Sequence, residues 1–216
     1  MAIRFPAVRH GLTALLLTAA VVAAPVVALA QDPRIAPKQQ KKLPEPPGKL
    51  PKVGADKTRG LDFLFGALKA APDEASAKHV EARIWALWLQ TPSDTAALLM
   101  MRAKVAMDAQ QTDVAMKLLD AVIKLRPDYV EAWNRRATLY YLKNDYAHSL
   151  EDIEQVLVRE PRHFGALAGL GMIMQDLGEE KRALDAFRQA LAINPHLEKV
   201  PELVKTLTEK VEGRDI

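Results

Sequence analysis

Residues 130–163 read VEAWNRRATLYYLKNDYAHSLEDIEQVLVREPRH, and residues 164–197 read FGALAGLGMIMQDLGEEKRALDAFRQALAINPHL. Both blocks are 34 residues long, and both carry a proline at the thirty-second place. Residues 96–129 form a third block, with Pro127 at the same place. A fixed period of this length is typical of proteins built from stacked structural repeats.

Other places recur with the same spacing. Within each block, apolar residues stand at i, i+3, i+4 and i+7 in two runs separated by a short polar turn, which predicts two amphipathic helices. The eighth place holds a small residue in each block: Ala103, Ala137 and Gly171. The twentieth place also holds a small residue, namely Ala115, Ser149 and Ala183, and the twenty-fourth holds a bulky one, namely Leu119, Ile153 and Phe187. Because a single hairpin cannot bury both of its faces, neighbouring hairpins must stack.

This pattern resembles the tetratricopeptide repeat, whose signature is a small residue at places eight and twenty and a proline at place thirty-two. The resemblance covers residues 96–197 in three consecutive copies, 96–129, 130–163 and 164–197. It implies an all-α fold, a right-handed superhelical solenoid of helical hairpins. Residues 198–216 contain apolar residues at helical spacing with Lys and Glu between them, which predicts a C-terminal capping helix and tail.

Residues 61–95 precede the first full copy and predict an N-terminal helical hairpin, because Pro72 splits two apolar runs. Placing Pro92 at the thirty-second place makes this hairpin either a degenerate fourth repeat or a separate cap. We expect its two tryptophans, Trp85 and Trp88, to pack against the first full repeat.

The first thirty residues predict a cleavable signal peptide. They contain Arg4 and Arg9 and no acid, then an apolar run over residues 12–24, then Ala28-Leu29-Ala30. The alternative is an uncleaved membrane anchor, but the run is shorter than the about 20 residues that cross a bilayer. We therefore expect cleavage after Ala30 and a periplasmic protein.

Residues 31–60 predict a disordered, Pro- and Lys-rich linker. They hold six prolines, and eight Lys or Arg against three Asp or Glu. Such a segment buries too little apolar surface to fold. It is either a solvated spacer or makes a weak contact with an anionic surface of the cell envelope.

The resemblance implies that the first helices of the repeats line a concave groove. The residues expected to bind a ligand there are Met100, Lys104, Met107, Asn134, Arg135, Thr138, Tyr141, Met172 and Gln175. Other inner places hold Ala97, Asp108, Glu131, Leu142, Gly165, Ala168 and Asp176, and we expect Gly165 and Gly169 to widen the groove toward the third repeat. Methionines, an aromatic residue and an amide suit an extended or helical peptide better than a nucleic acid. The alternatives are core packing for the methionines and a solvated helix face for the polar residues.

The sequence gives little support for catalysis. It contains no cysteine, its histidines show no metal-ligand spacing, and no glycine-rich phosphate loop follows a strand. We therefore expect no catalytic residue, no metal and no cofactor. The lysine, asparagine and arginine clamp by which related repeats hold a chaperone's terminal carboxylate is largely missing.

We predict a non-enzymatic scaffold or adaptor of the cell envelope that binds a protein or peptide in its groove and does not bind nucleic acid. The alternative is a structural factor for envelope assembly or attachment that uses its convex face or the basic linker. The sequence leaves the partner's identity and the oligomeric state open.

Overall fold

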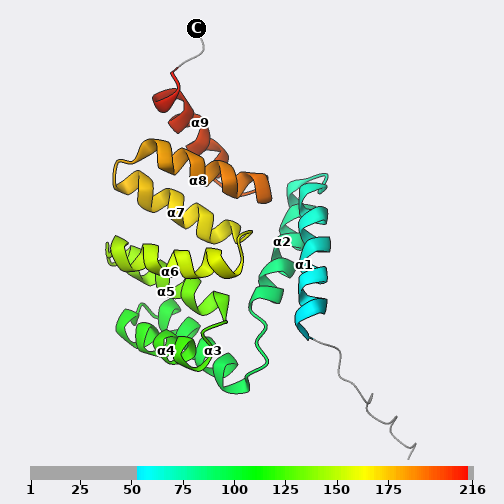
Figure 1. Cartoon of the computed structure of the whole chain (residues 1–216), viewed down its shortest axis with the longest axis vertical. Helices are drawn as coiled ribbons and strands as arrows, with labels where there is room; N and C mark the ends of the chain where they lie inside the picture. The colour runs from blue at the N-terminus through cyan, green and yellow to red at the C-terminus, as the bar shows by residue number, and fades with distance from the viewer. Residues whose placement is uncertain (1–52, 214–216) are drawn as a thin grey trace, which may run out of the picture. The chain divides into compact units, whose positions relative to one another are not determined.

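The computed structural model describes residues 53–213, and this part of the chain contains nine α-helices and no strand (Figure 1). The predicted signal peptide and residues 31–52 of the predicted linker lie outside the described residues. The helices are α1 (Val53–Lys69), α2 (Glu74–Trp88), α3 (Asp94–Asp108), α4 (Thr112–Leu125), α5 (Val130–Leu142), α6 (Tyr146–Arg159), α7 (Phe164–Asp176), α8 (Glu180–Ile193) and α9 (Val200–Val211). None of them is long and apolar enough to cross a lipid bilayer.

Helices α3 to α8 form three antiparallel hairpins, α3–α4, α5–α6 and α7–α8, that stack in chain order (Figure 1). The small residues of the repeat lie where the two helices of a hairpin cross. The Ser149 hydroxyl donates a 2.8 Å hydrogen bond to the carbonyl of Ala137, and a Cβ atom at Gly171 would lie 2.5 Å from the ring of Phe187. Larger residues at these places would force the helices apart. The predicted all-α repeat solenoid is confirmed.

The turn inside each hairpin has the same backbone conformation. Gln110, Asn144 and Gly178 stand 34 residues apart, and all three have a positive φ, 56°, 57° and 76°. Glycine and asparagine adopt this left-handed conformation readily, whereas a longer side chain such as that of glutamine is strained there. The repeat therefore extends to the turn that ends each first helix.

Helix α1 begins at Val53, inside the segment predicted as linker up to residue 60. The linker prediction is wrong at this end because the last proline of the segment is Pro51, and nothing after it interrupts a helix. The helix buries Leu61, Leu64 and Leu68 against α2.

The hairpin of α1 and α2, here called the N-terminal hairpin, does not continue the stack. It runs along the edge of the array where the second helix of one repeat leads into the first helix of the next (Figure 1). Trp88 stacks on His163, with ring centroids 4.1 Å apart, and Trp85 meets Phe164 edge-on at 5.5 Å. The expectation that both tryptophans pack against the first full repeat is wrong, because their partners, His163 and Phe164, lie at the junction between the second and third repeats.

Polar contacts tie the N-terminal hairpin to every junction between successive hairpins. Tyr129, before α5, donates a 2.6 Å hydrogen bond to the carbonyl of Leu89. Burial raises the pKa of Tyr129 to about 12, so the phenol keeps its proton. Arg162, before α7, pairs with Asp62 at 2.6 Å.

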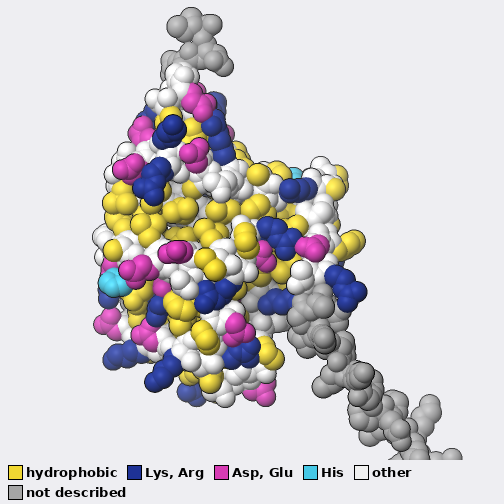
Figure 2. Space-filling model, viewed as in Figure 1, with side chains coloured by type: hydrophobic (Ala, Val, Ile, Leu, Met, Phe, Trp, Pro, Cys, Tyr) yellow, Lys and Arg dark blue, Asp and Glu magenta, His cyan; other side chains and the backbone are white. Residues whose placement is uncertain are grey.

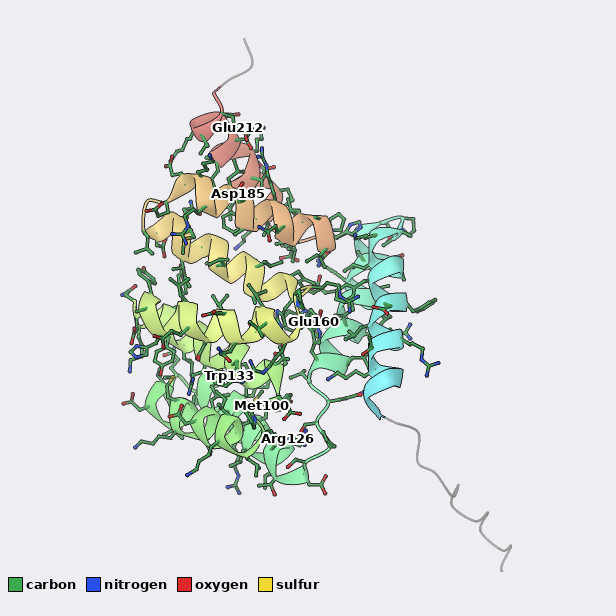
Figure 3. All side chains as sticks on the ribbon, viewed as in Figure 1. Met100, Arg126, Trp133, Glu160, Asp185 and Glu212 are labelled. Carbon is green, nitrogen blue, oxygen red and sulfur yellow. The ribbon has the colours of Figure 1, made fainter. Side chains whose placement is uncertain are left out.

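The last junction, between α8 and α9, is held in the same way. The amide of Asn194, which is completely buried, donates to Glu81 at 3.0 Å, and Lys78 pairs with Glu198 at 3.0 Å. Glu160, at the end of α6, lies on the same edge of the array (Figure 3). The N-terminal hairpin therefore bridges all three junctions.

Helix α9 packs against α8 and ends the stack at the C-terminal side. Val200 and Leu207 are buried, whereas the outward positions hold Glu202, Lys205 and Glu209. Charged side chains of both signs cover this end of the molecule (Figure 2). A polar outer face is what the terminal element of a repeat array needs.

Candidate binding groove

A pocket of about 330 Å³ lies between the first helices of the second and third repeats, α5 and α7. Most of its lining is apolar, and the floor includes two residues of α6. The lining residues are Asn134, Ala137, Thr138, Tyr141, Leu142, Ser149, Ile153, Gly165, Ala166, Ala168, Gly169, Met172 and Ile173. Pockets of this kind, largely apolar with a few polar groups, are the usual sites of ligand binding.

Glycine and alanine on α7 explain why the surface is hollow. A Cβ atom at Gly169 would meet only Ile153, at 3.7 Å, so this position leaves open space above the floor. Gly165 behaves differently, because a Cβ atom there would lie 2.9 Å from the ring of Trp85. The groove therefore opens at Gly169, as expected, but Trp85 of the N-terminal hairpin occupies the space beside Gly165.

Glu131 and His163 close the same end of the groove. Glu131 was expected on the inner face, yet it is 1% exposed and lies 2.8 Å from the Nε2 atom of His163, which is completely buried. The Nδ1 atom of His163 accepts a hydrogen bond from the backbone N–H of Ala166, so Nε2 carries the proton and donates to Glu131. Both side chains are satisfied within the fold and are not available to a ligand.

Two polar side chains line the wall that α5 contributes. The Thr138 hydroxyl donates to the carbonyl of Asn134 at 3.0 Å, a bond within the helix that occupies its only proton. The amide side chain of Asn134 makes no hydrogen bond to any residue in 53–213. Two N–H donors and one carbonyl acceptor are therefore free to pair with a ligand backbone.

Tyr141, Tyr146 and Asp176 form a cluster at the other end of the groove. Both phenols donate to the same carboxylate oxygen of Asp176, at 2.9 Å and 3.2 Å, and the two rings lie 5.9 Å apart. Burial and the nearby Asp176 carboxylate raise the pKa of both tyrosines, so both stay protonated at neutral pH. The cluster fixes the ring of Tyr141 at the groove's edge and ties α5, α6 and α7 together.

Four of the nine residues expected to bind a ligand lie together around this pocket: Asn134, Thr138, Tyr141 and Met172. The others do not join them. Lys104 pairs with Asp108 at 2.6 Å on α3, and Gln175 is exposed but outside the pocket. Arg135 lies 3.9 Å from Glu131, and its buried Nε atom has no hydrogen-bond partner.

The expectation for Met100 is wrong. Its side chain is only 5% exposed and packs in the core of the first repeat, with Met107 half-buried against the same cluster (Figure 3). Sequence reasoning also missed Ser149 and Ile153, which belong to a second helix. They reach the floor because the glycine at place six of α7, Gly169, has no side chain to cover them.

A second pocket, of about 650 Å³, lies between the N-terminal hairpin and the first two junctions. Three of its charged groups are in ion pairs: Arg126 pairs with Asp128 at 2.7 Å, and Glu160 pairs at 3.2 Å with Arg162, which lies outside the lining. Lys57 also lines it, and burial lowers the pKa of this ammonium group. The groove between α5 and α7 is more apolar and presents an unpaired amide, and it is the better candidate for a peptide.

Comparison with known proteins identifies the repeat. Residues 100–151 and 143–198 match the model of the tetratricopeptide repeat family. A TPR repeat-containing protein of Rhizobium etli is 40% identical over 153 residues, which cover 71% of this chain and 75% of that protein. The chain belongs to the tetratricopeptide repeat family.

Solved structures of tetratricopeptide repeat proteins share this fold at low sequence identity. The crystal structure of MamA superposes with a TM-score of 0.52 at 17% identity, covering 77% of this chain and 88% of that one. The first tetratricopeptide domain of Spaghetti (RPAP3), bound to the HSP90 peptide SRMEEVD, superposes with a TM-score of 0.53 at 14% identity, covering 56% of this chain and 97% of that one. At these identities the likeness concerns the fold alone.

Proposed function

We propose that this tetratricopeptide repeat protein is a non-catalytic scaffold or adaptor that holds a peptide segment of another protein between α5 and α7. One observation carries the proposal: an apolar groove beside which the amide of Asn134 has no partner among the described residues. Backbone groups of an extended or helical peptide would satisfy that amide, while an apolar side chain would fill the space over Gly169.

The comparisons support this reading of the fold. Tetratricopeptide domains of similar architecture were solved with an HSP90 peptide, in RPAP3, and in a complex with Hsp70, in yeast Sti1. In this protein the polar side chains that line the groove are only partly hydrogen-bonded, and none of the described lining residues is a lysine or arginine. The favoured ligand is therefore an apolar peptide segment and not an acidic C-terminus. The role we propose therefore differs from theirs in the chemistry of the ligand.

We further propose that the protein acts in the periplasm. The basic start, the short apolar run and the Ala28-Leu29-Ala30 ending of the first thirty residues support export. Mass spectrometry of the protein isolated from its host should give Gln31 as the first residue. An N-terminus at Met1 would overturn the proposed export.

The groove is tested by filling it. A leucine at Gly169 would project from α7 into the space above Ile153, so Gly169→Leu should abolish binding of the natural partner to the mature chain. Gly169→Ala is the matched control, because one methyl group at 3.7 Å from Ile153 leaves most of the groove open. Asn134→Ala should weaken binding by about tenfold, the value of one or two lost hydrogen bonds.

A partner that binds Gly169→Leu as tightly as the unmodified chain would exclude the groove. If binding were instead lost when residues 31–52 are removed, the protein would be an attachment factor that uses its basic linker. Circular dichroism of both variants shows whether a loss of binding comes from unfolding.

A further inference from the structure

The pocket of about 650 Å³ lies where the N-terminal hairpin meets the ends of α4 and α6. Leu61, Trp88 and Tyr129 give it a buried, largely apolar wall. The rest of the lining includes charged side chains, among them Arg126 and Glu160, which are labelled in Figure 3. None of its lining residues belongs to the groove between α5 and α7. We call it the hairpin pocket.

One hydrogen-bond donor in the lining of the hairpin pocket has no acceptor. Trp88 is 2% exposed, and the N–H of its indole ring makes no hydrogen bond to any residue in 53–213. The other two tryptophans of this part of the chain are satisfied, because Trp85 donates to Glu81 at 3.1 Å and Trp133 donates to the carbonyl of Pro127 at 2.9 Å. Buried N–H groups in folded proteins almost always have a partner, since the lost hydrogen bond costs free energy. A ligand oxygen in the pocket would supply the missing acceptor.

The ammonium group of Lys57 is a second group without a close partner. Lys57 is half-buried and makes neither an ion pair nor a hydrogen bond to any residue in 53–213. Burial lowers its pKa, although the carboxylates of Glu131, Glu160 and Asp128 act in the opposite direction from further away. These carboxylates therefore compensate the buried charge only in part, and an anion at hydrogen-bond distance would stabilise it.

The charges of the lining fit a ligand with one negative charge. The described lining contains three cations, Lys57, Arg126 and Arg159, and two acids, Asp128 and Glu160. Both acids are in ion pairs, whereas Arg159 donates only to groups of its own helix, α6. A carboxylate would neutralise the excess of one positive charge. A phosphate group with two negative charges would be repelled more strongly by the two acids.

We propose that the hairpin pocket binds a carboxylate-bearing ligand with an apolar body, at a site separate from the peptide groove. The two oxygens of a carboxylate can accept hydrogen bonds from the Lys57 ammonium and the Trp88 N–H. The apolar body then contacts Leu61 and Tyr129. A free carboxylic acid and the C-terminus of a peptide share this chemistry.

Matched probes on the mature chain test the site and distinguish these two sources. Octanoate represents a free carboxylic acid and N-acetylleucine a peptide C-terminus, while octanamide and N-acetylleucinamide have the same bodies without the charge. We expect at least one acid to bind in isothermal titration calorimetry, and its amide to bind at least about tenfold more weakly. The acid that binds more tightly identifies the source. If neither acid bound at millimolar concentration, or each amide bound as tightly as its acid, the proposal would be overturned.

The indole N–H of Trp88 reports binding without any change to the pocket. Its proton resonance in nitrogen-15 NMR, assigned by its loss in Trp88→Phe, should move downfield when the acid binds, because the N–H gains an acceptor. The N–H resonances of Trp85 and Trp133 should move less, since both already donate to protein oxygens. A saturating acid that leaves the Trp88 resonance in place would contradict the proposed site.

Lys57→Met tests the charge and keeps the length of the side chain. This variant should bind the acid at least about tenfold more weakly. Lys69→Met is the matched control, because Lys69 is an exposed residue of α1 outside the pocket. Gly169→Leu fills the peptide groove and should also leave acid binding unchanged, so failure of this proposal can be told apart from failure of the proposed function. Equal binding by the two lysine variants, or loss of binding in Gly169→Leu, would overturn the site. If Lys57→Met did not fold, the Trp88 resonance would still decide.

Discussion

Three glycines of α7 allow the packing of the molecule to be tested with one methyl group each. Gly165, Gly169 and Gly171 lie within two turns of the same helix, so replacement by alanine changes helix propensity in the same direction in all three. The gain is about 0.5–1 kcal/mol at an interior position. What differs is the neighbour that the new Cβ atom would meet.

The distances rank the three variants. At Gly169 the nearest atom is 3.7 Å away, an ordinary contact, so Gly169→Ala should stabilise the protein by about 0.5–1 kcal/mol. At Gly165 the Cβ atom would lie 2.9 Å from the ring of Trp85, which is held between Trp88 and Phe164. Overpacking of this kind costs about 1–3 kcal/mol, so Gly165→Ala should be destabilising despite the propensity gain.

Gly171→Ala should be the most destabilising of the three. Its Cβ atom would lie 2.5 Å from Phe187, a ring with no exposed surface and no room to move. The cost is at the upper end of the same range, about 3 kcal/mol. The hairpin α7–α8 must separate to admit the methyl group, whereas at Gly165 the N-terminal hairpin can shift.

Urea denaturation followed by circular dichroism measures the three free energies of unfolding. Near-ultraviolet circular dichroism separates the two destabilised variants: Gly165→Ala should alter the signal of the tryptophan cluster in the folded state, and Gly171→Ala should not. If Gly165→Ala were as stable as Gly169→Ala, with an unchanged tryptophan signal, the docking of the N-terminal hairpin on α7 would be refuted.

Three further predictions concern single side chains. Gln110→Gly should stabilise the protein by about 1 kcal/mol in thermal or urea unfolding, because Gln110 holds a φ of 56° where the third repeat has Gly178; no gain would show that this turn is not strained. Arg136 donates two hydrogen bonds, of 2.7 Å and 2.8 Å, to the buried carboxylate of Asp152 and also pairs with Asp120. Arg136→Met should therefore lower the free energy of unfolding by about 3 kcal/mol, and adding Asp152→Leu should restore most of that stability. A double variant no more stable than Arg136→Met would contradict this assignment. The Asp145 carboxylate raises the pKa of His148, so NMR titration of His148 should give a pKa above about 6.5, and this pKa should fall in Asp145→Asn. The ion pair stabilises the fold at pH values where Asp145 is ionised and His148 is protonated. This stabilisation is lost as pH rises through the raised pKa of His148 or falls through the lowered pKa of Asp145.

The repeat itself could be predicted from the sequence because its determinants are local. The small residues Ser149 and Gly171 and the core residues Leu119 and Phe187 recur every 34 residues, and each acts through contacts within its own hairpin or the next. A period in the sequence therefore reports a period in the packing.

The N-terminal hairpin could not be placed in the same way. Two tryptophans indicate burial but do not name a partner, and the partners of Trp88, His163 and Phe164, stand more than seventy residues further along the chain. The position of this hairpin also changes the surroundings of two residues, Gly165 and Glu131, whose places in the repeat normally face the groove. Gly165 instead accommodates the ring of Trp85, and Glu131 accepts a hydrogen bond from His163.

The residues around the candidate groove were predicted in part for a related reason. Asn134, Thr138, Tyr141 and Met172 lie where the repeat pattern puts them, around the pocket between α5 and α7. Met100 occupies an equivalent inner place, yet it is buried in the first repeat. The exposed fraction of a side chain depends on the side chains around it, and the spacing of residues in the sequence does not predict it.

Photo-crosslinking in the living cell tests most directly whether a guest chain occupies the groove. A photoreactive amino acid at Met172, which is 42% exposed in the groove, should capture one defined partner, and the same group at Val158 should not. Adding Gly169→Leu should abolish the capture. Capture of the same partner from both positions, or capture that persists when the groove is filled, would contradict a ligand held between α5 and α7.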